Sequence, residues 1–307
     1  MKNFAKITGY VFLSLFFLLV ACKNNESNKN KETILKGTTT ILVDETLKPI
    51  IEDQIEVFES KYNAKIIMDA KSEKELIQAF INDTSSIAIL TRTLTDTEKK
   101  NFDLKKIIPK ITPIGTDAIA FISNKNAKDT LISLQKVVDF MQGKSNSSIN
   151  GLVFDNPNSS TVRYINELAG IKELPGKGVF SFKTNNEVIK FVSENDEMIG
   201  VVGVNWLSQP TPAMKEFVKK INVLSVQSIG GKEYYAPTQN NIAEGTYPLA
   251  RDLFIINCQG FSGLGMGFAS FVAGDIGQRI ILKSGLLPIR IPGRKLIIKN
   301  DINNDKE

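Results

Sequence analysis

Residues 37–62, "GTTTILVDETLKPIIEDQIEVFESKY", decide the fold class because the pattern of the chain changes within them. The stretch "GTTTILVD" is rich in β-branched side chains and predicts a strand. Apolar residues then recur every three or four positions, at Leu47, Ile51, Ile55, Phe58 and Tyr62. That spacing places them on one face of a helix, so the stretch predicts a strand followed directly by a helix.

The same alternation continues along the chain. "AKIIMDA" (64–70) and "SIAILT" (86–91) predict strands, and "SEKELIQAFIND" (72–83) between them predicts a helix. Later stretches repeat the pattern, and residues 267–285 predict one long helix. Alternating strands and helices predict parallel sheets flanked by helices. We therefore expect an α/β protein with two lobes and a crevice between them.

Composition excludes several classes of function. The chain has 307 residues, a formal net charge of +5 and no histidine. The absence of histidine rules out Ser-His-Asp and Cys-His catalysis and removes the commonest neutral metal ligand. Lysine and arginine are spread along the chain without dense basic blocks, so nucleic acid is not an expected partner.

The N-terminus predicts export. "MKNFAK" is basic, and "ITGYVFLSLFFLLV" is an apolar run that is short for a membrane span. "LVAC" follows it and resembles the lipobox of bacterial lipoproteins, which implies a signal peptide over 1–21 and lipidation of Cys22. An uncleaved N-terminal anchor is the alternative. Residues 22–35 are mostly polar and predict a flexible tether.

Five further stretches resemble one family, the phosphate-binding proteins of bacterial phosphate ABC transporters. In chain order they are "DAIAFISNKN" (117–126), "ISLQKVVDFMQGK" (132–144), "SSTVR" (159–163), "MIGVVGVNW" (198–206) and "FASFVAGDIGQRIILKSGLLP" (268–288). The resemblance runs from about Gly37 to Pro292 and depends more on the order of the stretches than on any one of them.

The resemblance implies a type II periplasmic-binding-protein fold, in which each of two hinge-linked lobes is a mostly parallel sheet flanked by helices. We expect the first lobe to comprise residues 36–116 and 240–299, and the second lobe to comprise 117–239. In that family the lobes close on one dehydrated oxyanion, which is delivered to a membrane permease. The family catalyses no reaction, and no cofactor is implied.

"NSSTVR" (158–163) is the strongest candidate for an anion site. Ser159, Ser160 and Thr161 offer hydroxyl and backbone donors at the start of a helix, where the helix dipole favours negative charge. Arg163 offers a positive charge, ideally through a bidentate fork. The alternative is an ordinary helix cap with a solvated arginine.

A second cluster lies in "ILTRTLT" (89–95). Thr91 and Arg92 follow a predicted strand, at the end of the sheet where open α/β folds bind ligands. Thr95 and Glu98 also form a capping-box pattern, which is compatible with that role. Asp117 begins the predicted strand between the lobes, where it would orient Arg92, contact the ligand or simply lie in solvent.

The first loop, "VDETLKP" (43–49), is acidic where the family has neutral donors. Thr46 still supplies a hydroxyl and an amide for phosphate, whereas Asp44 and Glu45 would repel a dianion in a low-dielectric cleft. One of these carboxylates is a candidate acceptor for the proton of monohydrogen phosphate. Four residues near the expected return to the first lobe receive no ligand role: Tyr234, Tyr235, Gln239 and Arg251.

The sequence thus predicts an exported, lipid-anchored solute-binding protein that captures inorganic phosphate or a related oxyanion and presents it to an ABC permease. A monomer is expected from the fold class. A sensor or adaptor with an altered cleft is the main alternative. A phosphate-ester hydrolase using Ser159 or Ser160 ranks last, because no histidine, metal-ligand cluster or neighbouring lysine base supports it.

Overall fold

The computed structural model describes residues 32–83, 86–144 and 148–293. The predicted signal peptide, Cys22 and most of the predicted tether lie outside these ranges. At the described end of the tether, Thr33 bridges to Lys36, and the Glu32 Oε1 atom accepts a hydrogen bond of 2.6 Å from the backbone N of Leu264. Every helix in the described ranges is too short or too polar to cross a lipid bilayer.

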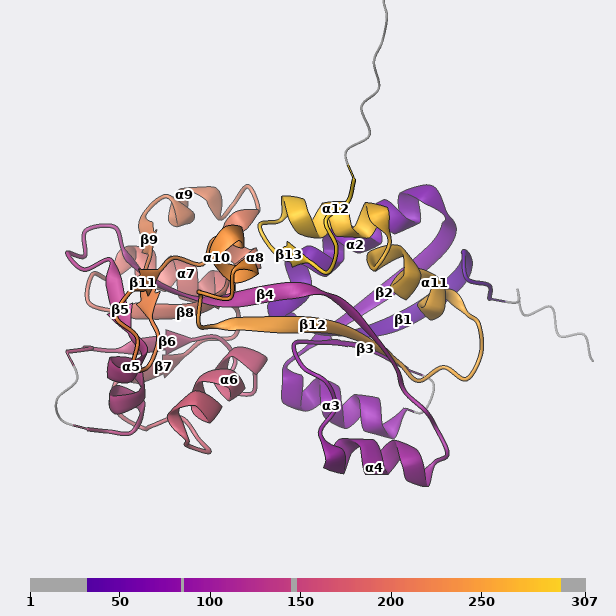
Figure 1. Ribbon diagram of the computed structural model, residues 1–307, viewed down its shortest axis with the longest axis horizontal. Helices are drawn as coiled ribbons and strands as arrows, with labels where there is room; N and C mark the ends of the chain where they lie inside the picture. Colours follow the sequence, from indigo (N-terminus) through magenta and orange to yellow (C-terminus); the bar gives the residue numbers. More distant parts are fainter. Residues whose placement is uncertain (1–31, 84–85, 145–147, 294–307) are drawn as a thin grey trace, which may run out of the picture.

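Two lobes lie side by side and are joined by two long strands, β4 (Lys110–Asn124) and β12 (Ala250–Asn257) (Figure 1). The first lobe contains β1 (Lys36–Asp44), the 3₁₀ turn η1 (Glu45–Leu47), α2 (Lys48–Lys61), β2 (Asn63–Lys71), α3 (Glu73–Asn82), β3 (Ile87–Leu90), α4 (Asp96–Leu104), α11 (Leu264–Val272), α12 (Asp275–Lys283) and β13 (Leu287–Pro288). The second lobe contains β5 (Leu131–Ser133), α5 (Leu134–Met141), β6 (Leu152–Phe154), α6 (Ser160–Ala169), β7 (Val179–Ser181), α7 (Asn185–Glu194), β8 (Ile199–Gly203), α8 (Asn205–Ser208), α9 (Lys215–Val218), β9 (Ile221–Val223), β10 (Ser225–Gln227) and β11 (Tyr234–Tyr235). The short helix α10 (Gln239–Ala243) follows where the chain returns to the first lobe.

One sheet runs through both lobes in the order β2-β1-β3-β12-β4-β8-β6-β7, and β9 and β13 also pair with β4. The pairs at its two ends, β1 with β2 and β3, and β6 with β7 and β8, are parallel. The central pairs that involve β4 and β12 are antiparallel. Each lobe is therefore a mostly parallel sheet, and antiparallel strands connect the two lobes.

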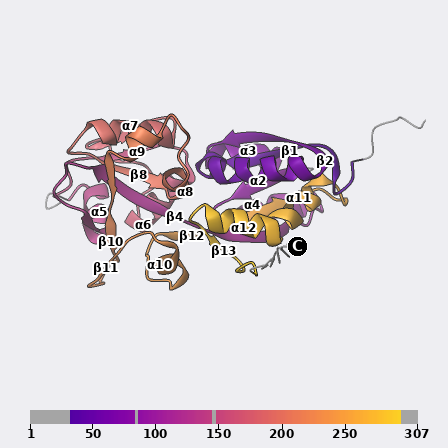
Figure 2. The same cartoon turned by 90° about the horizontal axis from the view of Figure 1, so that it is seen from above.

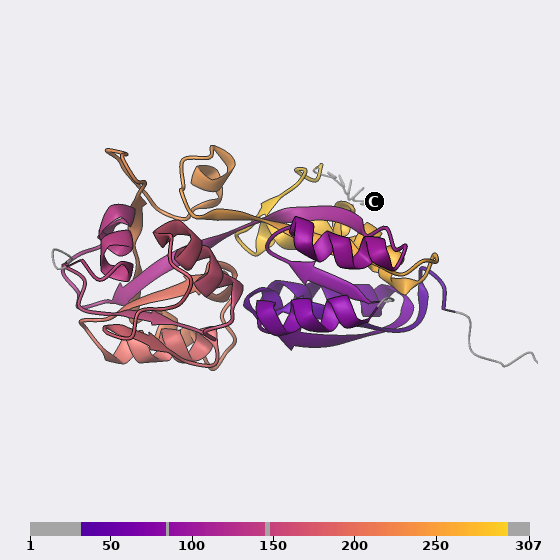
Figure 3. The same cartoon turned by 90° about the horizontal axis from the view of Figure 1, so that it is seen from below.

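Helices cover both faces of the sheet in the first lobe. In Figure 1, α2, α11 and α12 lie on one face, and α3 and α4 lie on the other. Figures 2 and 3 show these two faces from above and from below, with the second lobe beside them. The predicted apolar face is confirmed: Leu47 of η1 and Ile51 and Phe58 of α2 are at most 1% exposed, and Ile55 and Tyr62 are partly buried against the same core.

The strand that was expected from Asp117 begins seven positions earlier, at Lys110. Pro113 and Gly115 look like strand breakers in the sequence, but the register of β4 against β12 shifts at this point, between Leu253 and Phe254. A bulge tolerates proline because the ladder is locally interrupted there. Asp117 consequently lies within the strand and is fully buried, rather than at a solvated strand start.

The single long helix expected over 267–285 is wrong. The chain forms α11 and α12, which are separated at Gly274. A Cβ atom added to Gly277 would lie 2.4 Å from the backbone O of Val272, so only glycine permits this close approach. The turn lets α12 pack against α2 and β4 instead of extending past them.

Candidate functional site

Three polar side chains that are distant in the sequence meet between the lobes. Thr46 lies in η1, Ser160 begins α6, and Arg251 lies near the start of β12. The Thr46 Oγ1 and Ser160 Oγ atoms are 3.0 Å apart. Arg251 donates from Nη1 to Ser160 Oγ at 3.0 Å and from Nη2 to Thr46 Oγ1 at 3.2 Å. We call these three residues, together with Asp44 and Asp117, the cage.

Asp117 holds the guanidinium of Arg251 in place. The two residues are direct partners in the pairing of β4 with β12. Arg251 Nη2 donates to Asp117 Oδ2 at 2.9 Å, and the side chains are only 2% and 0% exposed. A buried guanidinium is tolerable because this carboxylate and the two hydroxyls accept its hydrogen bonds.

Asp44 closes the cage from the first lobe. Its Oδ1 atom accepts hydrogen bonds from Thr46 N at 3.0 Å and from Thr46 Oγ1 at 2.9 Å. Its Oδ2 atom is buried without a hydrogen-bond partner among the described residues. Burial raises the pKa of Asp44 above its ordinary value, and the positive charge of Arg251 opposes that shift.

Two side chains from α8 attach the second lobe to the first loop. Asn205 donates to the backbone O of Thr46 at 3.0 Å, and the indole N–H of Trp206 donates to the same oxygen at 2.8 Å. Asn205 also lies 3.4 Å from Asp117 Oδ2. The loop predicted from "VDETLKP" is thereby fixed against the opposite lobe.

A second buried carboxyl, Asp155, lies at the start of the hydroxyl-rich segment. Ser159 donates to Asp155 Oδ1 at 2.5 Å, and Asn185 donates to Oδ2 at 2.8 Å. Burial, reinforced by the negative charge of Asp44, raises the pKa of Asp155 to about 7. Ser159 also caps α6, since its Oγ atom accepts from Val162 N at 3.2 Å. The capping alternative from the sequence is therefore correct for Ser159.

Thr91 and Thr161 are buried where the sequence placed them, after β3 and in the first turn of α6. The Oγ1 atoms of both residues lack a hydrogen-bond partner among the described residues. Neither is bonded to the cage, and their roles toward a ligand stay predictions. Glu45 is half-buried beside the cage, and burial together with the charges of Asp155 and Asp44 raises its pKa to about 7.

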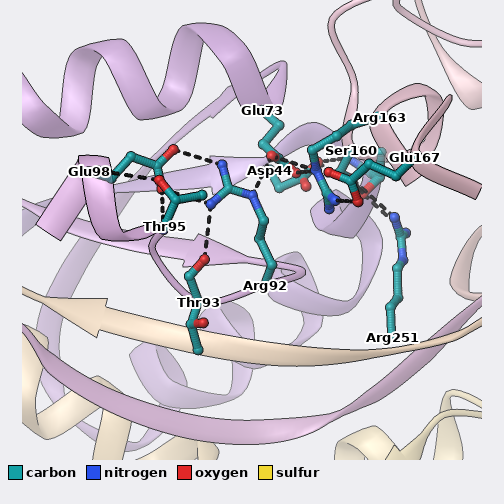
Figure 4. A network of polar contacts seen from close by, with 11 residues as sticks. Asp44, Glu73, Arg92, Thr93, Thr95, Glu98, Ser160, Arg163, Glu167 and Arg251 are labelled. Atoms are coloured by element: carbon teal, nitrogen blue, oxygen red, sulfur yellow. Dashed lines mark hydrogen bonds and ion pairs between the residues drawn. The ribbon is translucent and has the colours of Figure 1, made fainter. Parts of the chain in front are cut away.

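Arg92 and Arg163, the two predicted arginines, lie in a separate network centred on Glu73 (Figure 4). Arg92 Nε donates to Glu73 Oε1 at 2.7 Å, and Arg163 Nε lies 2.8 and 3.0 Å from the two Glu73 oxygens. Glu98 also binds Arg92, at 2.8 and 2.9 Å, and Glu167 binds Arg163 at 2.7 Å. We call these five residues the rim network.

The rim network also connects the lobes, because Glu73 begins α3 whereas Arg163 belongs to α6. The backbone N of Lys74 donates to the backbone O of Asn158 at 3.3 Å beside it. The predicted capping box of Thr95 and Glu98 is confirmed, and Glu98 also accepts hydrogen bonds from Arg92. Both predicted arginines are thus neutralised by carboxylates in this structure, and their roles toward a ligand stay predictions.

Sequence reasoning missed Arg251, which is the cation of the cage. One signal could have identified it: "YPLARDLFIIN" (247–257) is a strand-like run, and an arginine there lies among buried positions. Such an arginine needs a buried carboxylate. Asp117, which was expected to orient Arg92, is that partner. Asp155, Asn185 and Asn205 were missed for the same reason, since only tertiary packing assembles them.

Whether the cage can bind an oxyanion depends on which of the buried carboxyls are protonated. The cage contains one guanidinium and two buried carboxyls, Asp44 and Asp117, and Asp155 is a third buried carboxyl nearby, so the region would be net negative if all three were ionised. The raised pKa values of Asp44 and Asp155 reduce that charge. A protonated carboxyl donates a hydrogen bond, and an ionised one accepts the proton of an acidic ligand. No group of three or more His, Cys, Asp or Glu side chains in the described ranges is arranged to hold a metal ion.

Two phosphate-binding proteins are similar to this chain in sequence. The phosphate-binding protein PstS of Borreliella burgdorferi is 26% identical over 306 residues, covering 93% of this chain and 99% of that protein. PstS of Staphylococcus epidermidis is 28% identical over 269 residues, covering 81% and 78%.

Solved structures show the same fold. A phosphate ABC transporter substrate-binding protein from Clostridium perfringens, with bound phosphate, has a TM-score of 0.67 at 21% identity and covers 83% of this chain and 100% of that one. An ABC-type phosphate transport receptor from Vibrio cholerae has a TM-score of 0.62 at 17% identity, covering 82% and 100%. The family model of the PBP superfamily domain matches residues 28–275. The chain therefore belongs to the PBP superfamily and has the type II periplasmic-binding-protein fold that its sequence predicts.

Proposed function

We propose that this protein captures phosphate or a related oxyanion in the cage between its lobes and delivers it to an ABC permease. The observation that carries the proposal is the meeting of Thr46, Ser160 and Arg251, which come from both lobes and from a connecting strand and are all buried. The relatives named above are phosphate-binding proteins, and the Clostridium perfringens structure holds phosphate.

Capture requires the lobes to separate. In the closed structure the three donors are bonded to one another, at 3.0 and 3.2 Å. An entering anion would accept the hydrogen bonds that these groups now exchange, and charge-assisted bonds to a guanidinium are stronger than neutral ones. Closure would then bury the anion, in the manner of hinge closure around a ligand.

Asp44 would make the cage selective for one type of anion. When ionised, its unpartnered Oδ2 atom would accept the proton of monohydrogen phosphate. Sulfate carries no proton at neutral pH and would face that carboxylate without a hydrogen bond. We propose that this repulsion selects phosphate over sulfate. Glu45 lies beside the cage as a second candidate acceptor.

Export and anchoring complete the proposal. The signal peptide over 1–21 and lipidation at Cys22 would hold the binding domain at the outer side of a bacterial membrane, tethered near its permease. Mass spectrometry of the membrane-extracted protein tests the lipid on Cys22. We further propose that the protein acts as a monomer and catalyses no reaction. We also propose that the boundaries between its lobes lie at residues 117 and 240.

Calorimetric titration of the full-length chain with phosphate and with sulfate tests the function. Phosphate should bind with a measurable heat, and thermal unfolding should shift upward by RT ln(1 + [L]/Kd). Sulfate should bind more weakly. The transport proposal fails if no oxyanion produces either heat or a shift, and turnover of a phosphomonoester would favour a hydrolase instead.

A sensor or adaptor is the second candidate, and one observation favours it. The donors of the cage are already satisfied by one another, and Glu73 neutralises both arginines of the rim network. A cleft whose polar groups already satisfy one another could present its surface to a partner directly. Absence of anion binding together with a stably closed shape in solution would support this candidate.

A further inference from the structure

The end of the first lobe that lies away from the second lobe carries a group of exposed apolar side chains (Figure 1). Three segments form it: 32–36 at the start of the described chain, 104–111 from the end of α4 to the start of β4, and 260–262 between β12 and α11. We call these segments the distal surface. Its exposed large apolar residues are Ile34, Leu35, Leu104, Ile108, Ile111 and Phe261. Ile108 and Leu104 are 88% and 85% exposed, the highest values among large apolar side chains in the described ranges.

The topology of the sheet brings these segments together. The parallel strands β1 and β3 begin at this edge of the sheet, and β12, which is antiparallel to β3, ends here. Asn257 at the end of β12 pairs with Lys110 at the start of β4, so the second and third segments leave neighbouring strands. Glu32 of the first segment accepts a hydrogen bond from the backbone N of Leu264, two residues after the third. The three segments therefore lie next to one another.

Positive charge prevails on the distal surface. Its lysines are all exposed, and they are Lys36, Lys105, Lys106 and Lys110. Only one acid, Glu32, belongs to the three segments, and Asp103 directly precedes the second segment. A contiguous group of exposed apolar side chains marks an interaction site on a protein or a membrane. The added lysines favour a membrane, because lysines near a bilayer are attracted to anionic headgroups.

The N-terminal segment of the chain joins the molecule at this same surface. Ten residues, 22–31, separate Glu32 from its membrane attachment if Cys22 carries the proposed lipid. An extended chain spans at most about 3.6 Å per residue, so Glu32 would stay within roughly 36 Å of the bilayer. A short tether raises the effective concentration of the distal surface at the bilayer. Weak individual contacts to lipid would therefore be sufficient for docking.

We propose that the distal surface docks on the anionic headgroup surface of the membrane that holds the protein's N-terminus. The cage lies at the opposite edge of the sheet, because Lys36 begins β1 whereas Asp44 ends it. A strand of this length spans about 27 Å, so the docked protein would keep its cage clear of the bilayer. The inference goes beyond the proposed function, since it concerns lipid rather than phosphate, and shares with it only the N-terminal membrane attachment.

A fluorophore beside Phe261 tests the proposal. Ser262→Cys is labelled with a nitrobenzoxadiazole group in the membrane-extracted protein, and buried Cys258 should stay unlabelled. The protein is reconstituted in vesicles of phosphatidylcholine and phosphatidylglycerol that contain nitroxide-labelled lipid as the quencher. Ser181→Cys is the matched control, because Ser181 follows the exposed Phe180 on β7, at the opposite end of the sheet. Lipid should quench the label at position 262 and not the label at position 181.

A second pair of variants separates docking from proximity through the tether alone. Leu104→Ser with Ile108→Ser removes two apolar side chains from another segment of the distal surface. The ratio of docked to undocked protein should fall about tenfold or more, because their transfer out of water is lost, and quenching at position 262 should fall to the control level. Leu131→Ser with Ile229→Ser removes exposed residues of the same types from the second lobe and should leave quenching unchanged. Thermal unfolding should be alike in all variants, since every substituted side chain is exposed.

Lipid composition tests the role of the lysines. Vesicles of phosphatidylcholine alone should quench the label at position 262 less, because the lysines then face no anionic headgroup. Equal quenching with and without phosphatidylglycerol overturns the inference, and so does quenching that survives Leu104→Ser with Ile108→Ser. Absence of quenching at position 262 also overturns it. If the same double variant then abolishes self-association of the protein, the distal surface binds a second copy instead. The phosphate titrations are independent of these results, so the proposed function stands or fails separately.

Discussion

The cage and the rim network both pair arginine with carboxylates between the lobes, but they differ in depth and in origin. Arg251 lies on a connecting strand with a side chain 2% exposed, and it binds hydroxyls of both lobes. Arg92 and Arg163 are 20% and 24% exposed, and their main partner is the carboxylate of Glu73. Figure 4 shows the two groups side by side, with Arg251 directed at Ser160 and Arg92 enclosed by acids.

An arginine that is close to a hydroxyl motif in the sequence is not necessarily the arginine that binds its hydroxyl groups. Arg163 follows Ser160 by three positions, yet its guanidinium binds Glu73 and Glu167. Arg251 is 91 positions away from Ser160 and is bonded to it. A buried arginine can bind a ligand only if another group also accepts its hydrogen bonds and balances its charge. Asp117, its partner on the neighbouring strand, does this for Arg251.

The largest effect is expected at Arg251. Arg251→Met leaves Asp117 buried without its ion pair, which should destabilise the fold by about 3–5 kcal/mol. Phosphate affinity should also fall by about a hundredfold or more, because two charge-assisted bonds are lost. Urea unfolding and calorimetry measure the two effects.

A surface arginine provides the control for this variant. Arg279 pairs with Asp275 at 3.3 Å on α12, with side chains 39% and 52% exposed. Arg279→Met should cost less than about 1 kcal/mol, as exposed pairs do. If Arg251→Met costs no more than Arg279→Met, then the cage is not the buried site described here.

The next largest effect is expected in the pH dependence of stability, through the buried carboxyls in and beside the cage. The pKa of Asp155 is raised to about 7, so the folded state binds more protons than the unfolded state between about pH 4 and 7. Stability should therefore fall as the pH rises through that window. Each pKa unit is worth about 1.4 kcal/mol, so the loss is on the order of a few kcal/mol.

Asp155→Asn should flatten this slope, measured as the urea midpoint from pH 4 to 8. Part of the slope should remain, since Glu45 and Asp44 also have raised pKa values. Asp139 is the control, because its bond to Lys144 lowers its pKa. Asp139→Asn should leave the pH dependence of the urea midpoint unchanged. If Asp155→Asn also left it unchanged, Asp155 would not be a buried carboxyl with a raised pKa.

Local patterns predicted much of the fold and only part of the site. The face of α2 and the capping box at Thr95 follow from periodicity and spacing, which depend on neighbours in the chain. The cage depends on the pairing of Asp117 with Arg251, which only the register of β4 against β12 determines. A residue pattern around Ser160 contains no information about that register, so the hydroxyls were predictable and their cation was not.

Glu73 should control how firmly the lobes are held together. Glu73→Gln removes the carboxylate that Arg92 and Arg163 share, and the lost charge-assisted bonds should cost about 2 kcal/mol. Because only the bond to Arg163 crosses between lobes, the ligand-free protein should also become more open. Small-angle scattering should then report a larger radius of gyration. Glu98→Gln is the matched control, since Glu98 binds Arg92 within the first lobe. Opening in Glu98→Gln, or none in Glu73→Gln, would remove Glu73 from this role.

The smallest effects are expected at Arg163 and Arg92, the two partly buried arginines of the rim network, and they test the ligand role that the sequence predicts for both. Arg163→Ala removes an interlobe contact and should weaken phosphate binding about fivefold, equivalent to about 1 kcal/mol. Arg92→Ala leaves the bond between Glu73 and Arg163 and should weaken phosphate binding less, because the hydrogen-bond partners of Arg92, which are Glu73, Thr93 and Glu98, all lie in the first lobe. Calorimetry of both variants gives the ranking. If instead Arg163→Ala abolishes binding as Arg251→Met does, then Arg163 must leave Glu73 and enter the cage when the anion binds, and Arg163 would belong to the binding site together with Arg251.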